Sequence, residues 1–136
     1  MLTKILCILV IASVSACLGR GKPPACEALA AQGAHVASGR CVVDGDVTTR
    51  DYKESRLPEN LTVGGDLQIF GCGVNSLPKG LRVGKSIDLY KSCVTRLPPD
   101  LVVGGNVDSQ LAFGDDLLSC KDIPKTARIG GWVRCE

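Results

Sequence analysis

Apolar and polar residues alternate in a pattern that repeats along most of the chain with a period of 20 residues. The repeat is marked by the dipeptides Leu57-Pro58, Leu77-Pro78 and Leu97-Pro98, with Ile123-Pro124 as a degenerate fourth. Within each unit, Leu-x-Val and Leu-x-Ile segments place apolar residues at every second position. This alternation is typical of short strands that bury one face.

Aligning the units on these dipeptides places the apolar residues in four columns. The columns are Leu57, Leu77, Leu97 and Ile123; Leu61, Leu81, Leu101 and Ala127; Val63, Val83, Val103 and Ile129; and Leu67, Ile87, Val107 and Val133. Upstream, residues 41–56 fit the same frame, with Cys41 matching Leu61, Val43 matching Val63 and Val47 matching Leu67. One such unit cannot bury its apolar side alone, so the pattern predicts a solenoid of stacked units.

The unit resembles the short bacterial leucine-rich repeat, whose L-x-L-x-x-N-x-L segment corresponds here to residues 67–74 and 87–94. The resemblance covers residues 41–136, but Cys72 and Ser92 occupy the asparagine position. Gly-Gly pairs such as Gly64-Gly65 lie between the two alternating segments, where glycine permits a positive φ and a tight corner. We therefore expect a mainly β, helix-poor solenoid, leucine-rich-repeat-like or β-helix-like. A short N-terminal helical cap is predicted from Pro24 and residues 25–32, with Gly33 as its stop.

The first 24 residues carry a targeting pattern. An apolar run over residues 5–14 is too short to span a bilayer but suits a signal peptide. Val14-Ser15-Ala16-Cys17 resembles the lipobox of bacterial lipoproteins. That resemblance implies removal of residues 1–16, lipidation of Cys17 with palmitate-type acyl chains, a tether over 17–24 and an exported domain over 25–136. Leu18 then favours the outer membrane over the inner one. The alternative is an ordinary signal peptide that happens to have a cysteine after the cut.

The cysteine count and the charge narrow the function classes. The formal net charge of +2 falls to +1 without Lys4, which gives no reason to expect a nucleic-acid partner. Of eight cysteines, Cys7 leaves with the signal peptide and Cys17 takes the lipid, so six remain. An even number in an exported chain indicates disulfides. The absence of a C-x-x-C pair and the presence of a single histidine, His35, argue against a metal site.

Spacing alone leaves 15 connectivities open for six cysteines, but the repeat frame favours one of them. Cys72 and Cys93 lie nearly in one column of neighbouring coils, one position out of register. Cys120 matches Val74 and Cys135 matches Ile69, so both are expected to point inward and to close the C-terminal end. Stacked coils about 4.8 Å apart suit disulfide geometry. We predict the pairs Cys26–Cys41, Cys72–Cys93 and Cys120–Cys135.

Two surfaces are candidates for binding. The spacing from Leu97 to Ile123 exceeds the repeat by six residues, and the insertion carries Phe113, Asp115 and Asp116. Insertions in solenoids often project from a binding face, although a loop that folds Phe113 and Leu117 back over the last coil is the favoured interpretation of this one. The second surface is a polar strip with an acidic bias, formed by outward positions beside the second strand of each unit. Its members are Asp66, Gln68, Asp88, Tyr90 and Asp108. Solenoids often bind partners on such strips, and a merely solvated face is an equal alternative.

No catalytic constellation is found in the sequence, and the lone His35 does not favour one. We expect a cell-envelope lipoprotein without enzymatic activity or cofactor, anchored through its lipid and binding a protein partner. An envelope inhibitor, or an immunity or exclusion protein that blocks a toxin, a hydrolase or a phage, is the alternative. A structural spacer is a third possibility.

Overall fold

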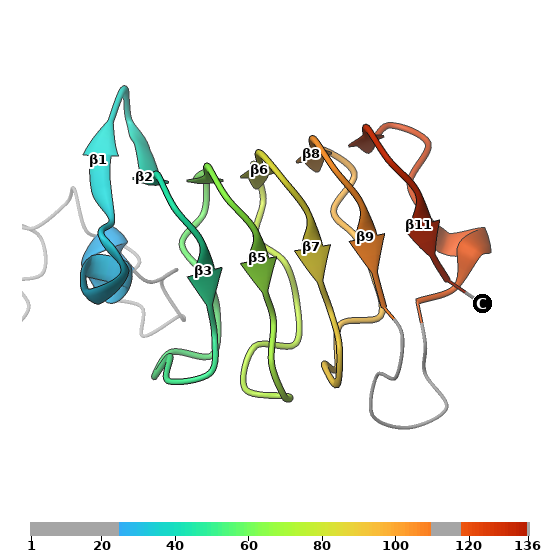
Figure 1. Cartoon of the computed structure of the whole chain (residues 1–136), viewed down its shortest axis with the longest axis horizontal. Helices are drawn as coiled ribbons and strands as arrows, with labels where there is room; N and C mark the ends of the chain where they lie inside the picture. Colours follow the sequence, from blue (N-terminus) through green and yellow to red (C-terminus); the bar gives the residue numbers. More distant parts are fainter. Residues whose placement is uncertain (1–24, 110–117, 136) are drawn as a thin grey trace, which may run out of the picture.

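Two β-sheets made of very short strands form the sides of a β-solenoid (Figure 1). The computed structural model describes residues 25–109 and 118–135. From residue 41 onward, each unit contributes one strand to the first sheet and the next strand to the second. The mainly β solenoid with a short N-terminal helical element confirms the predicted fold class.

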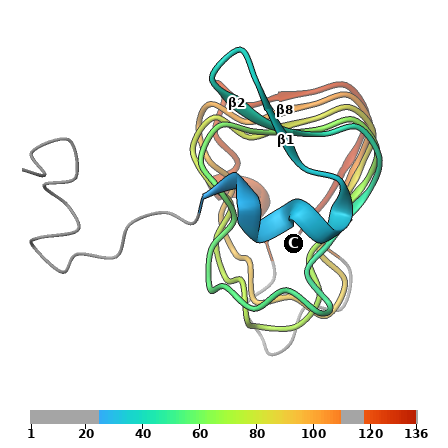
Figure 2. The same ribbon diagram turned by 90° about the vertical axis from the view of Figure 1, so that its left-hand side faces the viewer.

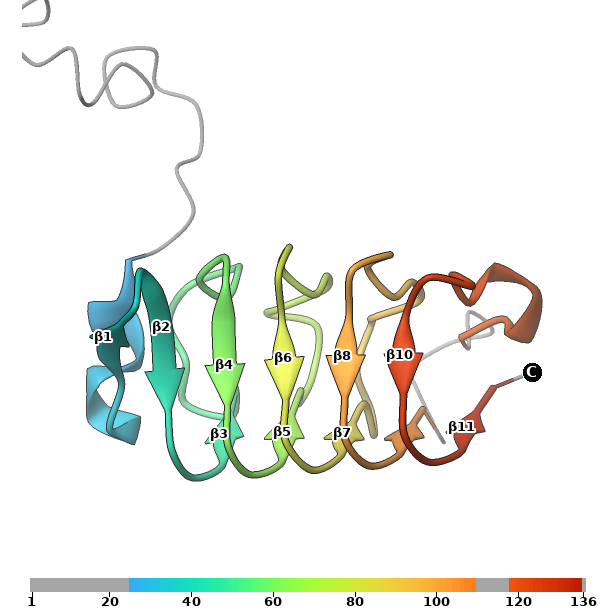
Figure 3. The same cartoon turned by 90° about the horizontal axis from the view of Figure 1, so that it is seen from above.

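The first sheet has six strands and the second has five. In spatial order the first contains β1 (His35–Ala37), β2 (Arg40–Val43), β4 (Leu61–Val63), β6 (Arg82–Val83), β8 (Val102–Val103) and β10 (Arg128–Ile129). Figure 3 shows these strands side by side. The second contains β3 (Val47–Thr48), β5 (Leu67–Gln68), β7 (Ile87–Asp88), β9 (Val107–Asp108) and β11 (Val133–Arg134). The β1–β2 pairing is antiparallel and the other pairings in these sheets are parallel.

The strand register confirms the predicted apolar columns. Cys41 pairs with Leu61 and Val43 with Val63 in the first sheet, while Val47 pairs with Leu67 in the second. The column residues of the middle coils are buried, whereas those of the last coil, such as Ile129 and Val133, are half-buried. The largest fully buried side chains are all aliphatic, and the buried core contains no aromatic ring among the described residues.

The glycines at the corner between the two strands serve a purpose other than the one predicted. Gly64, Gly84 and Gly104 do not adopt the left-handed conformation. Instead each corner stacks directly on the backbone of the preceding coil, and a Cβ on Gly84 would lie 2.5 Å from the carbonyl oxygen of Gly64. The corner therefore requires glycine because there is no room for a side chain, not because of φ.

The N-terminal end is closed by a 3-10 helix and a hairpin. The helix, η2 (Cys26–Gln32), buries Leu29 and ends at Gly33 with φ 86°, as the sequence predicts. It lies across the end of the solenoid (Figure 2). The hairpin was not expected from the repeat: Ser38 and Gly39 have φ of 51° and 73° and connect β1 to β2. Positive φ at both positions is characteristic of a two-residue hairpin turn.

Three disulfides join Cys26 to Cys41, Cys72 to Cys93 and Cys120 to Cys135, the pairs predicted from the repeat frame. Their Cα separations are 5.3, 4.9 and 5.1 Å.

Two details of the predicted cysteine geometry need correction. The bridge between Gly71 and Ser92 brings Cys72 level with Cys93, so these cysteines are in register rather than one position apart. Cys120 is exposed in the 3-10 helix η3 (Cys120–Asp122) instead of pointing inward, and Leu118 is the buried side chain nearby.

Several predicted positions lie outside the described residues. They are Cys17 with the rest of the targeting segment, and Phe113, Asp115 and Asp116 in the insertion. In the part of the chain that the structure describes, no helix is long and apolar enough to cross a membrane. Within the same residues, no three His, Cys, Asp or Glu side chains form a group that could hold a metal ion.

Candidate functional site

The outer face of the second sheet brings together the predicted strip residues. Asp66, Gln68, Asp88 and Asp108 line one shallow groove of about 300 Å³. The other residues that line this groove are Ser86, Ile87, Asn106 and Trp132. Tyr90 lies in an adjoining hollow together with Gln68 and Asp88, so the two hollows form one continuous surface across β5 and β7.

One row of polar side chains on this face is occupied in holding the coils together. The Oδ1 of Asp46 accepts a hydrogen bond from the backbone N–H of Asp66, and the Oδ1 of Asp66 accepts one from Ser86. The Oγ of Ser86 accepts from the N–H of Asn106, whose Oδ1 accepts from Trp132. These four bonds, of 2.7 to 3.0 Å, form a ladder from coil to coil. Because the indole of Trp132 has no acceptor atom, it cannot extend the ladder.

The neighbouring row is formed by the last residue of each strand of the second sheet. Gln68 is exposed between Thr48 and Asp88. Asp88 uses Oδ1 to accept a hydrogen bond from the backbone N–H of Tyr90 at 2.8 Å. Asp108 lies 3.7 Å from the guanidinium of Arg134 on the next strand. The row therefore presents amide and carboxylate groups at the regular spacing of the coils.

Aromatic side chains are concentrated on the same face and are exposed there. Phe70, Tyr90 and Trp132 have relative exposures of 40%, 38% and 48%. The chain has five aromatic residues in all, so three of them lie on one surface while the described core has none.

Each exposed ring has a cation over it. The distances from ring centroid to charge are 4.6 Å for Phe70 with Arg50, 5.2 Å for Tyr90 with Lys91 and 5.2 Å for Trp132 with Arg134. Such cation–π pairs contribute about 0.5–1 kcal/mol at exposed sites. The pairing limits the freedom of the rings and of the long cationic side chains.

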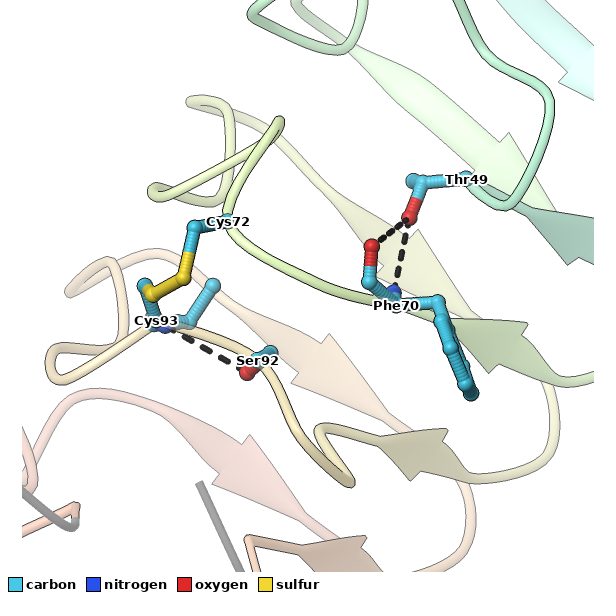
Figure 4. The surroundings of a disulfide bond; sticks show 6 residues. Thr49, Phe70, Cys72, Ser92 and Cys93 are labelled. Atoms are coloured by element: carbon cyan, nitrogen blue, oxygen red, sulfur yellow. Dashed lines mark hydrogen bonds between the residues drawn. A yellow bond between two sulfur atoms is a disulfide. The ribbon is translucent and has the colours of Figure 1, made fainter. Parts of the chain in front are cut away.

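The corner that carries Phe70 is held from both sides (Figure 4). The hydroxyl of Thr49 accepts a hydrogen bond from the N–H of Phe70 at 2.8 Å and lies 3.5 Å from its carbonyl oxygen. Two residues later, the Cys72–Cys93 disulfide ties this coil to the one that carries Tyr90. The backbone positions of both rings are thus fixed relative to each other.

The sequence predicts five residues of this surface, namely the polar strip, but not Phe70 or Trp132. Phe70 falls one period before Tyr90, and Trp132 pairs in register beside Asn106 at the ladder position. Extending the alignment of outward positions one unit back from Tyr90, and forward to the last coil, identifies both rings. The cationic partners Arg50 and Arg134 have no comparable signal, since surface arginines are common in any soluble domain.

Comparison with protein-family models, with curated proteins and with solved structures gave no match to this chain.

Proposed function

We propose that this protein is an exported, lipid-anchored module without enzymatic activity that binds a protein partner through the outer face of its second sheet. The observation that carries the proposal is the placement of Phe70, Tyr90 and Trp132 in solvent on one regular surface, while the described core contains no aromatic ring. Aromatic residues and arginine are enriched at protein interfaces. They also dominate the residues whose truncation most weakens binding.

The shape of the surface supports a macromolecular partner rather than a small ligand. The groove is shallow and extends across several coils. Small-molecule sites are concave and enclose most of their ligand. A repeat surface of this kind suits an extended contact with another protein.

The anchor is the second element of the proposal and rests on the lipobox-like residues 14–17. We expect Cys17→Ser to abolish incorporation of labelled palmitate and to release the protein from the membrane fraction. Cys7→Ser, in the apolar run of the same segment, is the matched control and should retain both the label and the membrane association. Membrane association that persists in Cys17→Ser would contradict lipid anchoring.

The binding face is tested by site-specific photo-crosslinking in intact cells. A photoreactive phenylalanine analogue at position 90 or 132 should yield one dominant protein adduct. The same analogue at Arg82 or Val102, on the outer face of the first sheet, should yield none. Identical adducts from both sheets, or none from the second sheet, would overturn the proposal.

Truncating the aromatic side chains gives an independent measure of their contribution to partner binding. Trp132→Ala and Tyr90→Ala should each weaken binding of the identified partner by about tenfold or more, since aromatic hot spots typically contribute at least 1–2 kcal/mol. Val102→Ala is the control, because it removes an exposed apolar side chain of the other sheet. Circular dichroism and unfolding curves establish that all three variants remain folded.

A further inference from the structure

Among the described residues, one sheet edge at the N-terminal end of the solenoid is closed and the other is open. In the second sheet, the side chain of Gln32 forms hydrogen bonds with the backbone of Thr48, which occupies the edge of β3. In the first sheet, β1 is the edge strand and pairs with β2 alone. All three residues of β1 are exposed, and Val36 reaches 70%.

The backbone of Val36 points toward this open edge. The carbonyl of Val43 accepts a hydrogen bond from Gly64 in the next coil. By the alternation of a strand, Cys41 therefore also directs its N–H and C=O toward β4. Val36 lies opposite Cys41 in the hairpin, so this pair is not hydrogen-bonded. The N–H and C=O of Val36 consequently face outward, and within the described residues neither has a backbone partner.

The side chain of Val36 is also left without cover. Residues directly opposite each other in an antiparallel pair lie on the same face of the sheet, and Cys41 is buried on the inner face. Val36 thus extends the inward column of Cys41 and Leu61 by one strand but remains in solvent. Exposed edges in natural proteins are usually protected by charges, proline or a covering segment. The strand and its turn, His35 to Gly39, carry neither lysine nor proline.

We propose that β1 pairs in antiparallel fashion with β1 of a second copy of this chain, about a two-fold axis at Val36. A two-fold interface brings the same residues together from both copies. The two Val36 residues would exchange N–H···O=C bonds in both directions and pack their side chains against each other. A partner strand without charge suits this neutral edge, and the first sheet then continues from one copy into the other.

The experiment compares valine substitutions at the edge and in the middle of the same sheet. The full chain, extracted in mild detergent, should be dimeric by light scattering with protein mass resolved from detergent. Val36→Lys should raise the dimer dissociation constant by about tenfold or more, because two like charges would face each other across the axis. Val102→Lys, at an exposed valine of the interior strand β8, should leave the dimer unchanged.

A covalent test does not depend on the strength of the dimer. Hydrogen-bonded antiparallel pairs have Cα atoms about 5.5 Å apart, which is within the disulfide range. Val36→Cys should therefore form a covalent dimer under mild oxidation, whereas Val102→Cys should not. A monomeric wild-type protein, a dimer unaffected by Val36→Lys, or a Val36→Cys variant linked to a different protein would overturn the proposal.

Discussion

The side-chain amide of Gln32 completes the second sheet by binding the backbone of Thr48 as a neighbouring strand would. Its Nε2 donates to the carbonyl of Thr48 at 2.9 Å, and its Oε1 accepts from the N–H of Thr48 at 2.8 Å. The helix η2 that carries Gln32 thereby supplies, from one side chain, the donor and acceptor that the first coil lacks. Such a contact protects the edge of β3 from pairing with other chains.

This relationship gives a first prediction. Gln32→Ala should lower the free energy of unfolding by about 1–3 kcal/mol, because two hydrogen bonds are lost and two backbone groups lose their partner. Gln68→Ala, which removes an exposed glutamine from the same sheet, should change it by less than about 0.5 kcal/mol. Urea unfolding under non-reducing conditions measures the free energy of unfolding of both variants. Equal midpoints for the two variants would contradict the edge-closing role.

The corner glycines give a second prediction. Gly84→Ala should destabilise the fold by about 1–3 kcal/mol, since its Cβ would lie 2.5 Å from the carbonyl oxygen of Gly64 and the coils would have to separate. Gly45→Ala is the matched control: it also lies in a corner, but a Cβ there has no atom within 4 Å. Thermal unfolding of both variants tests the stacking argument. A Gly45→Ala variant as unstable as Gly84→Ala would contradict the stacking argument, because an alanine at position 45 meets no neighbouring atom.

The inward half of this fold could be predicted from the sequence because repeat spacing determines it directly. Leu61, Leu81 and Leu101 recur every 20 residues, and stacked coils must place equivalent residues in one column. The same frame placed Cys72 beside Cys93. Cys26 lies before the frame, and its pairing with Cys41 followed as the remaining pair. Burial constrains these positions, so their residue types are informative.

The roles of the outward-facing residues could not be predicted from the repeat in the same way. Asp66 and Asn106 are polar and would be expected on any surface, so nothing in their identity reveals that they accept backbone hydrogen bonds from the next coil. Strand β1 lies before the repeat begins, and only the Ser38-Gly39 dipeptide signals its turn. The reason for glycine at Gly84 depends on a contact between coils, which local sequence does not specify.

The ladder gives a third prediction, which separates the structural role of Asp66 from its charge. Asp66→Ala removes the acceptor for the N–H of Ser86 and should cost about 0.5–1.5 kcal/mol of stability. Asp66→Asn retains an acceptor oxygen and should remain within about 0.5 kcal/mol of the wild type. Exchange of the Ser86 amide hydrogen should be faster in Asp66→Ala alone. If the Ser86 amide hydrogen exchanges as fast in Asp66→Asn as in Asp66→Ala, then the carboxylate charge, and not the acceptor oxygen, holds the coils together.

The environment of Tyr52 gives a fourth prediction, on alkaline stability. Burial, and secondarily the charge of Glu54, raises the pKa of the Tyr52 phenol to about 12. Its hydroxyl donates to the carbonyl of Arg56 at 2.6 Å. In the unfolded chain a tyrosine has a pKa near 10. Below pH 10 both states keep the proton. Between about pH 10 and 12 the unfolded state releases it more readily, so the free energy of unfolding falls as the pH rises.

Tyr52→Phe isolates this effect because it removes the ionisable proton and keeps the ring. The variant should be less stable than the wild type at pH 8, where the hydrogen bond to Arg56 is lost. Its stability should then decline less steeply between pH 9.5 and 11.5, a window set by the ordinary and raised pKa values of the phenol, about 10 and about 12. Tyr90→Phe is the control, because Tyr90 lies in solvent on the second sheet. Unfolding curves across this range decide the matter: parallel declines for the wild type and Tyr52→Phe would show that Tyr52 does not link stability to pH.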